Sequence, residues 1–176
     1  KANHIVGQTE GLRRKPMKMV IYFLFALFMV TLLAGQLGFL NGKQPSNLGV
    51  KADRLKQPSF SPNSVSSQAD LYPDHPQLQY ARIEPLPLKD GNLATSMTKL
   101  ADVLRSLPST AIVETKPDYI YAQSQTRLLK FVDDVEFWFN PAKGAIDVRS
   151  SSRLGRKDFG VNRQRIELVR QKYMEN

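Results

Sequence analysis

Three carboxylates lie close together in the second half of the chain, where they could bind a hard cation or act as an acid/base pair. Asp133, Asp134 and Glu136 fall at the start of an alternating apolar segment. Hard cations take oxygen ligands, and positioned carboxyl groups are common general acids and bases. The alternative is structural, because carboxylates on a strand often pair with basic side chains on neighbouring strands. The arginines available for such pairing are Arg127, Arg149 and Arg153.

A run of hydrogen-bond donors follows this acidic cluster. Residues 149–153 read Arg-Ser-Ser-Ser-Arg, and Arg156, Lys157 and Arg163 come soon after. Guanidinium groups, hydroxyls and the N-terminus of a helix can together hold a phosphate or a carboxylate. We therefore predict a polar cluster that is either structural, through internal ion pairs, or anion-binding. Its candidate members are Asp133, Asp134, Glu136, Arg149, Arg153 and Arg163.

Several kinds of chemistry have no support in the sequence. There is no cysteine, which excludes disulfides and thiolate chemistry, and the two histidines, His4 and His75, lie far apart. A histidine-rich metal site is therefore not expected. The chain also lacks a Gly-rich phosphate loop and a Ser-His-Asp arrangement. We predict a protein that is not an enzyme and that carries no catalytic residue, cofactor or metal.

The net charge of +9 is high for 176 residues. No nucleic-acid recognition motif accompanies this charge, so nucleic acid is not an expected partner. Attraction to the anionic headgroups of a lipid bilayer requires only that the chain lies near a membrane.

The elements that position the polar cluster are predicted strands. Val135, Phe137 and Phe139 alternate with Glu136 and Trp138, which assigns one face of a strand to the core. Two short turns, around Pro117 and Gly144, separate neighbouring segments of strand character. The predicted strands are residues 111–116, 119–127, 135–140 and 145–153.

Two amphipathic helices flank these strands. The first begins at Asn92 or Thr95 and ends before Pro108, and the second runs over residues 161–173 with Asp158 or Asn162 as its cap. Their apolar stripes need a surface to cover, and a sheet with one apolar face provides it. Residues 91–176 are therefore predicted to form a two-layer α+β domain in the order helix, four strands, helix.

A proline-rich arm precedes this domain. Residues 41–90 contain many Pro, Ser, Asn and Gly residues, which exclude a regular helix through most of the stretch. The arm is either a disordered linker or an irregular segment that docks through its apolar residues. We expect the second, because Phe60, Leu71, Tyr72 and Ile83 are available to pack.

The N-terminal part of the chain predicts a membrane anchor. Residues 19–40 contain no charged residue, and about twenty residues of helix span a hydrocarbon core of about 30 Å. Arg13, Arg14, Lys15 and Lys18 precede this segment, so by the positive-inside rule residues 1–18 are cytoplasmic. We predict a single-pass protein of the bacterial inner membrane with a periplasmic C-terminal domain. A cleaved signal sequence is the alternative.

Three motifs carry a resemblance to a known family. They are residues 61–69 (SPNSVSSQA), residues 131–137 (FVDDVEF) with 146–155 (IDVRSSSRLG), and residues 158–163 (DFGVNR). In this order, over roughly residues 55–173, they closely resemble the bacterial domain-of-unknown-function family 1499. That resemblance implies a shared fold and leaves the activity open. It also implies cysteines around the Ser-Pro-Asn motif, where this chain has Ser64 instead.

Two functions are compatible with these features. The first is a non-enzymatic accessory or assembly subunit of a larger membrane complex, contacting other subunits through the transmembrane helix and the arm. The second is an extracytoplasmic domain that binds a small anionic ligand or acts as a hydrolase. A deep pocket lined by Asp134, Glu136 and Arg149 would favour the second.

Overall fold

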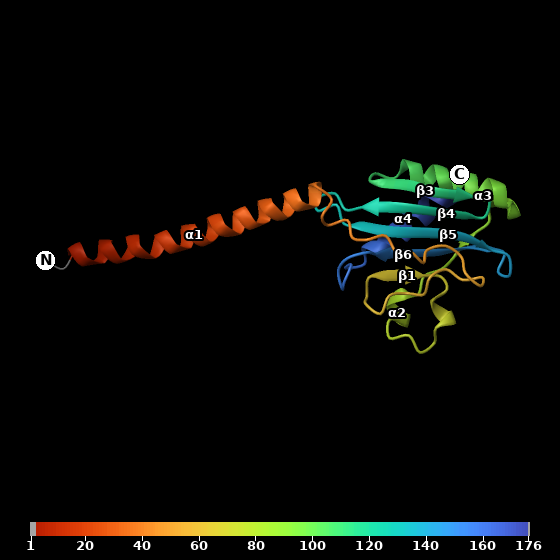
Figure 1. Ribbon diagram of the computed structural model, residues 1–176, viewed down its shortest axis with the longest axis horizontal. Helices are drawn as coiled ribbons and strands as arrows, with labels where there is room; N and C mark the ends of the chain where they lie inside the picture. Colours follow the sequence, from red (N-terminus) through yellow and green to blue (C-terminus); the bar gives the residue numbers. More distant parts are fainter. Residues whose placement is uncertain (1–2, 176) are drawn as a thin grey trace.

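The chain after α1 (Asn3–Gln36) folds into one α+β domain at the end of this long helix (Figure 1). The computed structural model describes residues 3–175, and the side chains of residues 17–175. The helices are α1 (Asn3–Gln36), α2 (Leu78–Ala81), α3 (Leu93–Ser106) and α4 (Val161–Met174), with 3-10 turns at Ala69–Leu71 and Lys89–Gly91. The strands are β1 (Ser64–Ser66), β2 (Leu86–Pro87), β3 (Thr110–Lys116), β4 (Tyr119–Gln125), β5 (Val132–Asn140) and β6 (Ala145–Ser152).

The strands form a single antiparallel sheet in the order β1-β6-β5-β4-β3, and β2 pairs with the first half of β6. The predicted α+β class and the helix–meander–helix order of residues 91–176 are confirmed. The sheet is larger than predicted because β1 and β2 come from the arm. Both are very short, so their sequences do not show the alternation by which strands are recognised.

One face of the sheet carries the main hydrophobic core. Leu100 and Leu104 of α3 and Ile166 and Val169 of α4 pack on it, and all four are almost fully buried. In Figure 1 both helices lie behind the strands. Asn92 caps α3, because its Oδ1 accepts from the backbone N–H of Thr95 at 3.0 Å.

The opposite face of the sheet is covered by the arm instead of by helices. Leu55 of the arm is 2% exposed and packs with Tyr119, Tyr121 and Trp138, and Leu48 and Val50 lie beside them. In Figure 1 the segment that follows α1 runs in front of β5 and β6. The arm is therefore an ordered layer of the domain, and the sheet lies between it and the helices.

Helix α1 projects away from the domain (Figure 1). Its stretch Met17–Gln36 has a mean hydropathy of 2.2, and residues 17–34 are not buried against the rest of the chain, so the stretch is long and apolar enough to cross a membrane. The side chains of Arg13, Arg14 and Lys15, on which the predicted orientation rests, lie outside the described residues. At its C-terminal end α1 meets the loop between β4 and β5, where Gln36 Nε2 donates to Leu128 O at 2.9 Å.

Candidate functional site

The face of the sheet beneath the arm carries a layer of polar side chains. Strand alternation directs Asp134 and Glu136 of β5 to this face, and the ladder sets Arg149 of β6 directly opposite Glu136. Arg153 follows the end of β6 on the same side. The arginines and the carboxylates therefore meet across neighbouring strands, as cross-strand pairing predicts.

Glu136 is the most buried member of this layer. Its Oε2 accepts from Arg149 Nη1 at 3.1 Å, and its Oε1 accepts from the Tyr119 hydroxyl at 2.9 Å and from the Gly49 backbone N–H at 2.7 Å. The Glu136 side chain is 0% exposed and that of Arg149 is 3% exposed. Burial, and then the nearby charge of Glu136, raises the pKa of Tyr119, which keeps its hydroxyl protonated as a donor.

The carboxylate of Asp134 accepts hydrogen bonds from Arg153 and Tyr121. Arg153 Nε and Nη2 lie 3.0 and 2.7 Å from its two carboxylate oxygens, and the Tyr121 hydroxyl donates to it at 2.6 Å. Such a two-pronged arginine–carboxylate contact is directional as well as strong. Each carboxylate of the pair Asp134 and Glu136 is thus neutralised by its own arginine. The layer has no free negative charge with which to attract a cation.

A third carboxylate, Asp147, ties the arm to the sheet. It is fully buried and accepts from the Ser67 hydroxyl at 2.7 Å and from Gln68 Nε2, Asn140 Nδ2 and Lys143 Nζ at 2.8, 2.8 and 3.0 Å. Burial alone would raise the pKa of Asp147, but these hydrogen bonds outweigh it and hold the pKa below its ordinary value.

A pH-dependent loss of stability is expected from Asp147. Because its pKa is lowered on folding, its stabilising effect is present above the pKa of an unfolded aspartate, about 3.9, and is lost as the pH falls through the lower folded value. In Asp147→Asn the free energy of unfolding should therefore fall less steeply as the pH is lowered, and at neutral pH it should be lower than that of the unchanged chain by roughly 1–3 kcal/mol. Urea unfolding measured between acid and neutral pH checks this. If the free energy of unfolding of Asp147→Asn falls with pH as steeply as that of the unchanged chain, Asp147 is not the cause of the loss of stability in acid.

Two of the predicted cluster residues lie elsewhere. Asp133 is adjacent to Asp134 on β5 and so points to the opposite face, where its Oδ2 is 2.5 Å from Arg165 Nη2 of α4. Arg163 also belongs to α4, and its Nη2 donates to the backbone carbonyls of Tyr80 and Arg82, each at 2.7 Å. The structure brings together Asp134, Glu136, Arg149 and Arg153 and leaves Asp133 and Arg163 in the helix layer.

A cavity of about 710 Å³ lies between the arm and this polar layer. Asp134, Arg149 and Arg153 form part of its floor, while the arm from Lys43 to Phe60 supplies most of its wall. Asp134 is the only carboxylate that lines it, within the part of the chain that the structure describes. The cationic side chains that line it are Lys43, Lys51, Arg54, Lys56, Arg149 and Arg153. The cavity therefore carries a strong excess of positive charge.

A tight turn sets two of these cations side by side. Lys51 and Arg54 exchange backbone hydrogen bonds of 2.9 and 3.1 Å across Ala52 and Asp53, which both have positive φ, 49° and 56°. Positive φ at both central positions is the pattern of a type I′ turn. For an alanine this conformation is uncommon. The turn holds the stems of Lys51 and Arg54 at the rim of the cavity.

Lys56 lies deeper than these rim residues. Partial burial, and then the positive charge of Arg149, lower the pKa of Lys56, while Glu136 and Asp134 oppose the shift. The Nε of Arg149 is buried and has no hydrogen-bond partner among the described residues. An anion in this cavity would relieve the repulsion between Lys56 and Arg149, because it attracts both charges.

Sequence reasoning missed the arm's part in this site. Lys51, Arg54 and Lys56 are isolated basic residues in an irregular segment, and neither Ala52 nor Asp53 has a glycine or Asn-Gly neighbour that would signal a turn. Arg165, the partner of Asp133, stands among other charged residues of α4 and was not distinguishable from a solvent-exposed residue. The one available signal was that the arm contains apolar residues, which predicted that it docks. The residues on which that prediction rested include Phe60 and Leu71, which are exposed, whereas Leu48, Val50 and Leu55 pack on this face of the sheet.

Comparison with known proteins gives one match. The model of a family described as "Protein of unknown function (DUF1499)" matches residues 47–173, which is most of the chain and confirms the predicted resemblance. The match begins before the turn at Lys51 and so includes nearly all of the cavity. No curated protein and no solved structure matches the chain.

Proposed function

Because the chain belongs to the DUF1499 family, whose function is unknown, we propose from the site itself that this is a membrane-anchored domain that binds a multivalent oxyanion, such as a phosphate ester. The observation that carries the proposal is the cavity between the arm and the sheet, where six cationic side chains face a single carboxylate. Four of these cations, Lys43, Lys51, Arg54 and Lys56, have no ion-pair partner among residues 17–175.

The charge balance of the cavity favours a ligand with more than one negative charge. Arg149 and Arg153 are already paired with Glu136 and Asp134, so their charge is largely compensated within the sheet. The charge of the arm lysines and of Arg54 is not. Oxyanions offer several acceptor oxygens, which suits a cavity lined by ammonium and guanidinium donors.

A titration of the full chain in detergent micelles tests the proposal. Sulfate, phosphate and pyrophosphate are added in turn at constant ionic strength, and the heat of binding is measured by calorimetry. We expect saturable binding whose affinity rises with ligand charge, and no binding of uncharged glycerol. The absence of binding under these conditions, or binding that is not saturable, would contradict a built anion site.

The membrane part of the proposal is supported by α1. Its exposed apolar stretch is suited to a lipid environment, and the four basic residues at its N-terminal side favour a domain outside the cytoplasm, on the periplasmic face of a bacterial inner membrane.

This topology makes a prediction with a clear readout. Alkaline phosphatase fused after Asn176 is expected to be active, because it folds only outside the cytoplasm, and a reporter active only in the cytoplasm is expected to be silent. The physical reason is the cost of moving Arg13, Arg14, Lys15 and Lys18 across the bilayer. The reverse pattern of activities would place the domain in the cytoplasm.

An accessory role in a membrane complex is a second candidate, and the observation that favours it is α1. None of residues 17–34 is buried by the domain, so lipid or a neighbouring membrane helix can cover them. The arm gives this role less support, because Leu48, Val50 and Leu55 pack on the chain's own sheet, although Phe60 and Leu71 stay exposed. Purification from native membranes in mild detergent, with a stoichiometric companion subunit as the supporting result, distinguishes the two candidates.

A further inference from the structure

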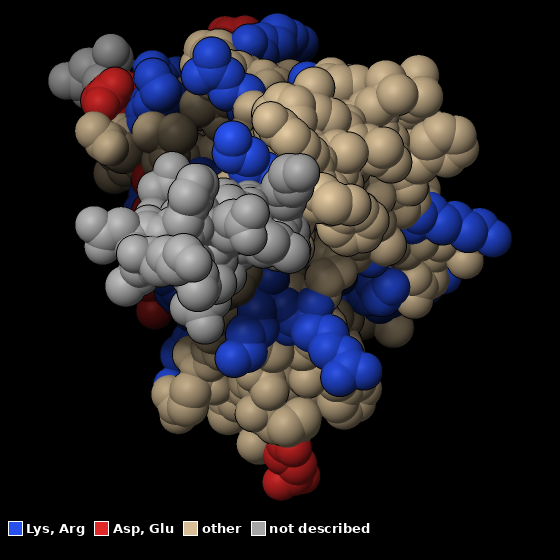
Figure 2. All heavy atoms as spheres, turned by 90° about the vertical axis from the view of Figure 1, so that its left-hand side faces the viewer, with Lys and Arg blue, Asp and Glu red and all other residues tan. Residues whose placement is uncertain are grey.

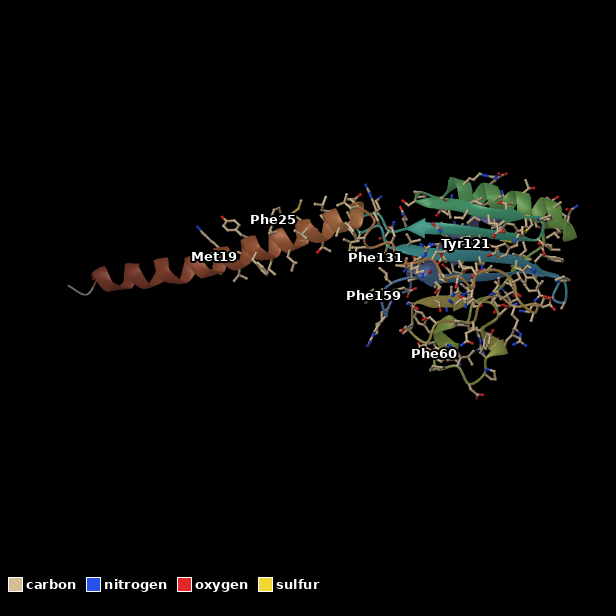
Figure 3. The ribbon with its side chains drawn as sticks, in the orientation of Figure 1. Met19, Phe25, Phe60, Tyr121, Phe131 and Phe159 are labelled. Atoms are coloured by element: carbon tan, nitrogen blue, oxygen red, sulfur yellow. The ribbon has the colours of Figure 1, made fainter. Side chains whose placement is uncertain are left out.

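Two loops of the domain lie beside the C-terminal end of α1. The first, residues 126–131, joins β4 to β5, and a Cβ added to Gly35 of α1 would stand 2.6 Å from Leu129 O. The second, residues 153–160, joins β6 to α4, and it packs on the segment that leaves α1, because a Cβ added to Gly42 would stand 2.8 Å from Arg153 Cβ. Phe131 and Phe159, one from each loop, lie at this end of the domain in Figure 3.

Large apolar side chains are exposed at this end. Phe159 is 88% exposed and Leu128 is 64% exposed, and Phe39, just after α1, is 77% exposed. Leu37 and Leu154 are exposed beside them. Single exposed apolar residues are ordinary, but several at one end of a domain mark a contact surface.

The charges at this end are almost all positive. Lys43, Arg127, Lys130, Arg156 and Lys157 belong to the two loops and to the segment after α1. The one acidic residue in residues 37–43, 126–131 and 153–160 is Asp158, which is buried. Figure 2 looks onto this end, and the charged side chains visible there are mainly Lys and Arg, with little Asp or Glu. We call these residues together the basic–apolar face.

The backbone holds the exposed side chains in place. Phe159 and Lys130 both have positive φ, 53° and 57°, which is uncommon for side chains of this size. Asp158 fixes the loop from inside, since its carboxylate accepts from the backbone N–H groups of Gly160 at 3.0 Å and of Asn162 at 3.1 Å. A strained conformation that presents a phenyl ring to solvent is typical of a functional contact.

We infer that the basic–apolar face docks onto the surface of the membrane that α1 crosses and binds anionic lipid headgroups there. Apolar side chains at the level of the headgroups and basic side chains around them are the features of peripheral membrane binding. The position of the face supports lipid as the occupant. Loop 126–131 contacts the last turn of α1, and loop 153–160 contacts Gly42 in the segment just after it, so both loops lie near the point where the helix would leave the bilayer. The inference rests on the anchor in the proposed function. It does not require an anion in the cavity, although Lys43 belongs to both the cavity and the face.

The test uses the full chain in lipid nanodiscs with a single fluorescent probe. The chain has no cysteine, so a single introduced cysteine can be labelled in each of three variants. Leu154→Cys places the probe in the basic–apolar face, and Ala142→Cys places it in the β5–β6 turn at the other end of the sheet. Ala26→Cys places it inside the predicted membrane span. A quencher attached to the lipid reports contact. The discs contain either phosphatidylcholine alone or an equal mixture with phosphatidylglycerol.

We expect the probe at Leu154 to be quenched in the mixed discs and much less in phosphatidylcholine, while the probe at Ala142 is quenched in neither. Arg156→Ala with Lys157→Ala should lower the ratio of docked to undocked domain in the mixed discs about 30-fold. Both side chains are exposed, so the double variant should fold normally.

Quenching at Leu154 that is no greater than at Ala142 would overturn the docking. Quenching at Leu154 that is unchanged both by the lipid charge and by the double substitution would also overturn it, because attachment to α1 alone would then explain the contact. The probe at Ala26 separates these outcomes from a failure of the anchor. Its quenching in every disc shows that α1 is inserted, and its absence would overturn the anchor together with the docking.

Discussion

Arg149→Ala is expected to lower the free energy of unfolding by about 3–5 kcal/mol, because it leaves the Glu136 carboxylate buried without its cation. The two side chains are 3% and 0% exposed, so Glu136 lies beneath the surface and has little access to water. The Tyr119 hydroxyl and the Gly49 N–H would remain as donors to Glu136, but neither carries a charge. Urea unfolding of the full chain in detergent, followed by the fluorescence of Trp138, measures the change.

The same sheet contains a matched control for this substitution. Lys116 and Glu114 form an ion pair on β3, but their side chains are 57% and 45% exposed. Lys116→Ala should therefore cost only about 0–1 kcal/mol. A double variant with Arg149→Ala and Glu136→Ala should cost less than the two single changes together, because the second change removes the unpaired charge. Equal, small effects of Arg149→Ala and Lys116→Ala would show that the buried pair is unimportant for stability.

Removing the three arm cations Lys51, Arg54 and Lys56 is expected to weaken pyrophosphate binding about 100-fold while the melting temperature stays unchanged. Each charge within about 4 Å of an anion contributes roughly 1 kcal/mol even at the dielectric constant of water, and each 1.4 kcal/mol is a factor of ten in affinity. The side chains of these residues make no hydrogen bond or ion pair in the described part of the chain, so their loss leaves no partner unsatisfied. Calorimetry and a thermal melt of the triple alanine variant measure both quantities.

A control with the same change in net charge separates binding from general electrostatics. Lys99, Arg105 and Lys172 lie on α3 and α4, on the other side of the sheet from the cavity. Their replacement by alanine should change pyrophosphate affinity by less than about twofold at physiological salt, since charges beyond about 8 Å are screened. Equal losses of affinity in the two triple variants would mean that only the overall charge attracts the anion.

The faces of β5 and β6 on which side chains lie could be predicted from the alternation of apolar and polar residues. The alternation of Val135 and Phe137 with Glu136 assigned Glu136 to the polar face, and the turn around Gly144 indicated a hairpin, so Arg149 was an available partner on the neighbouring strand. The structure sets Arg149 directly opposite Glu136. Asp133 was grouped with this cluster because it is adjacent in sequence. On a strand, adjacent residues point to opposite faces, and this is why Asp133 pairs with Arg165 instead.

The cavity could not be predicted in the same way, because it depends on contacts distant in sequence. The arm covers the sheet through bonds such as that from the Gly49 N–H to Glu136, 87 residues apart, and through the packing of Leu55 on Trp138. Neither contact has a periodic signal. Strands β1 and β2 were missed for the same reason, since each is too short to pair except where β6 already provides an edge.

The most direct test of the anion site is a crystal structure of the full chain with tungstate, a tetrahedral dianion whose anomalous scattering identifies it. We predict an anomalous peak inside the cavity between the arm and the sheet, within about 4 Å of Lys56 and of Arg54 or Arg149, which is the distance of an ion pair. The triple variant of Lys51, Arg54 and Lys56 should lose this peak. A cavity without tungstate, in crystals where the anion binds only at the basic–apolar face, would contradict the account.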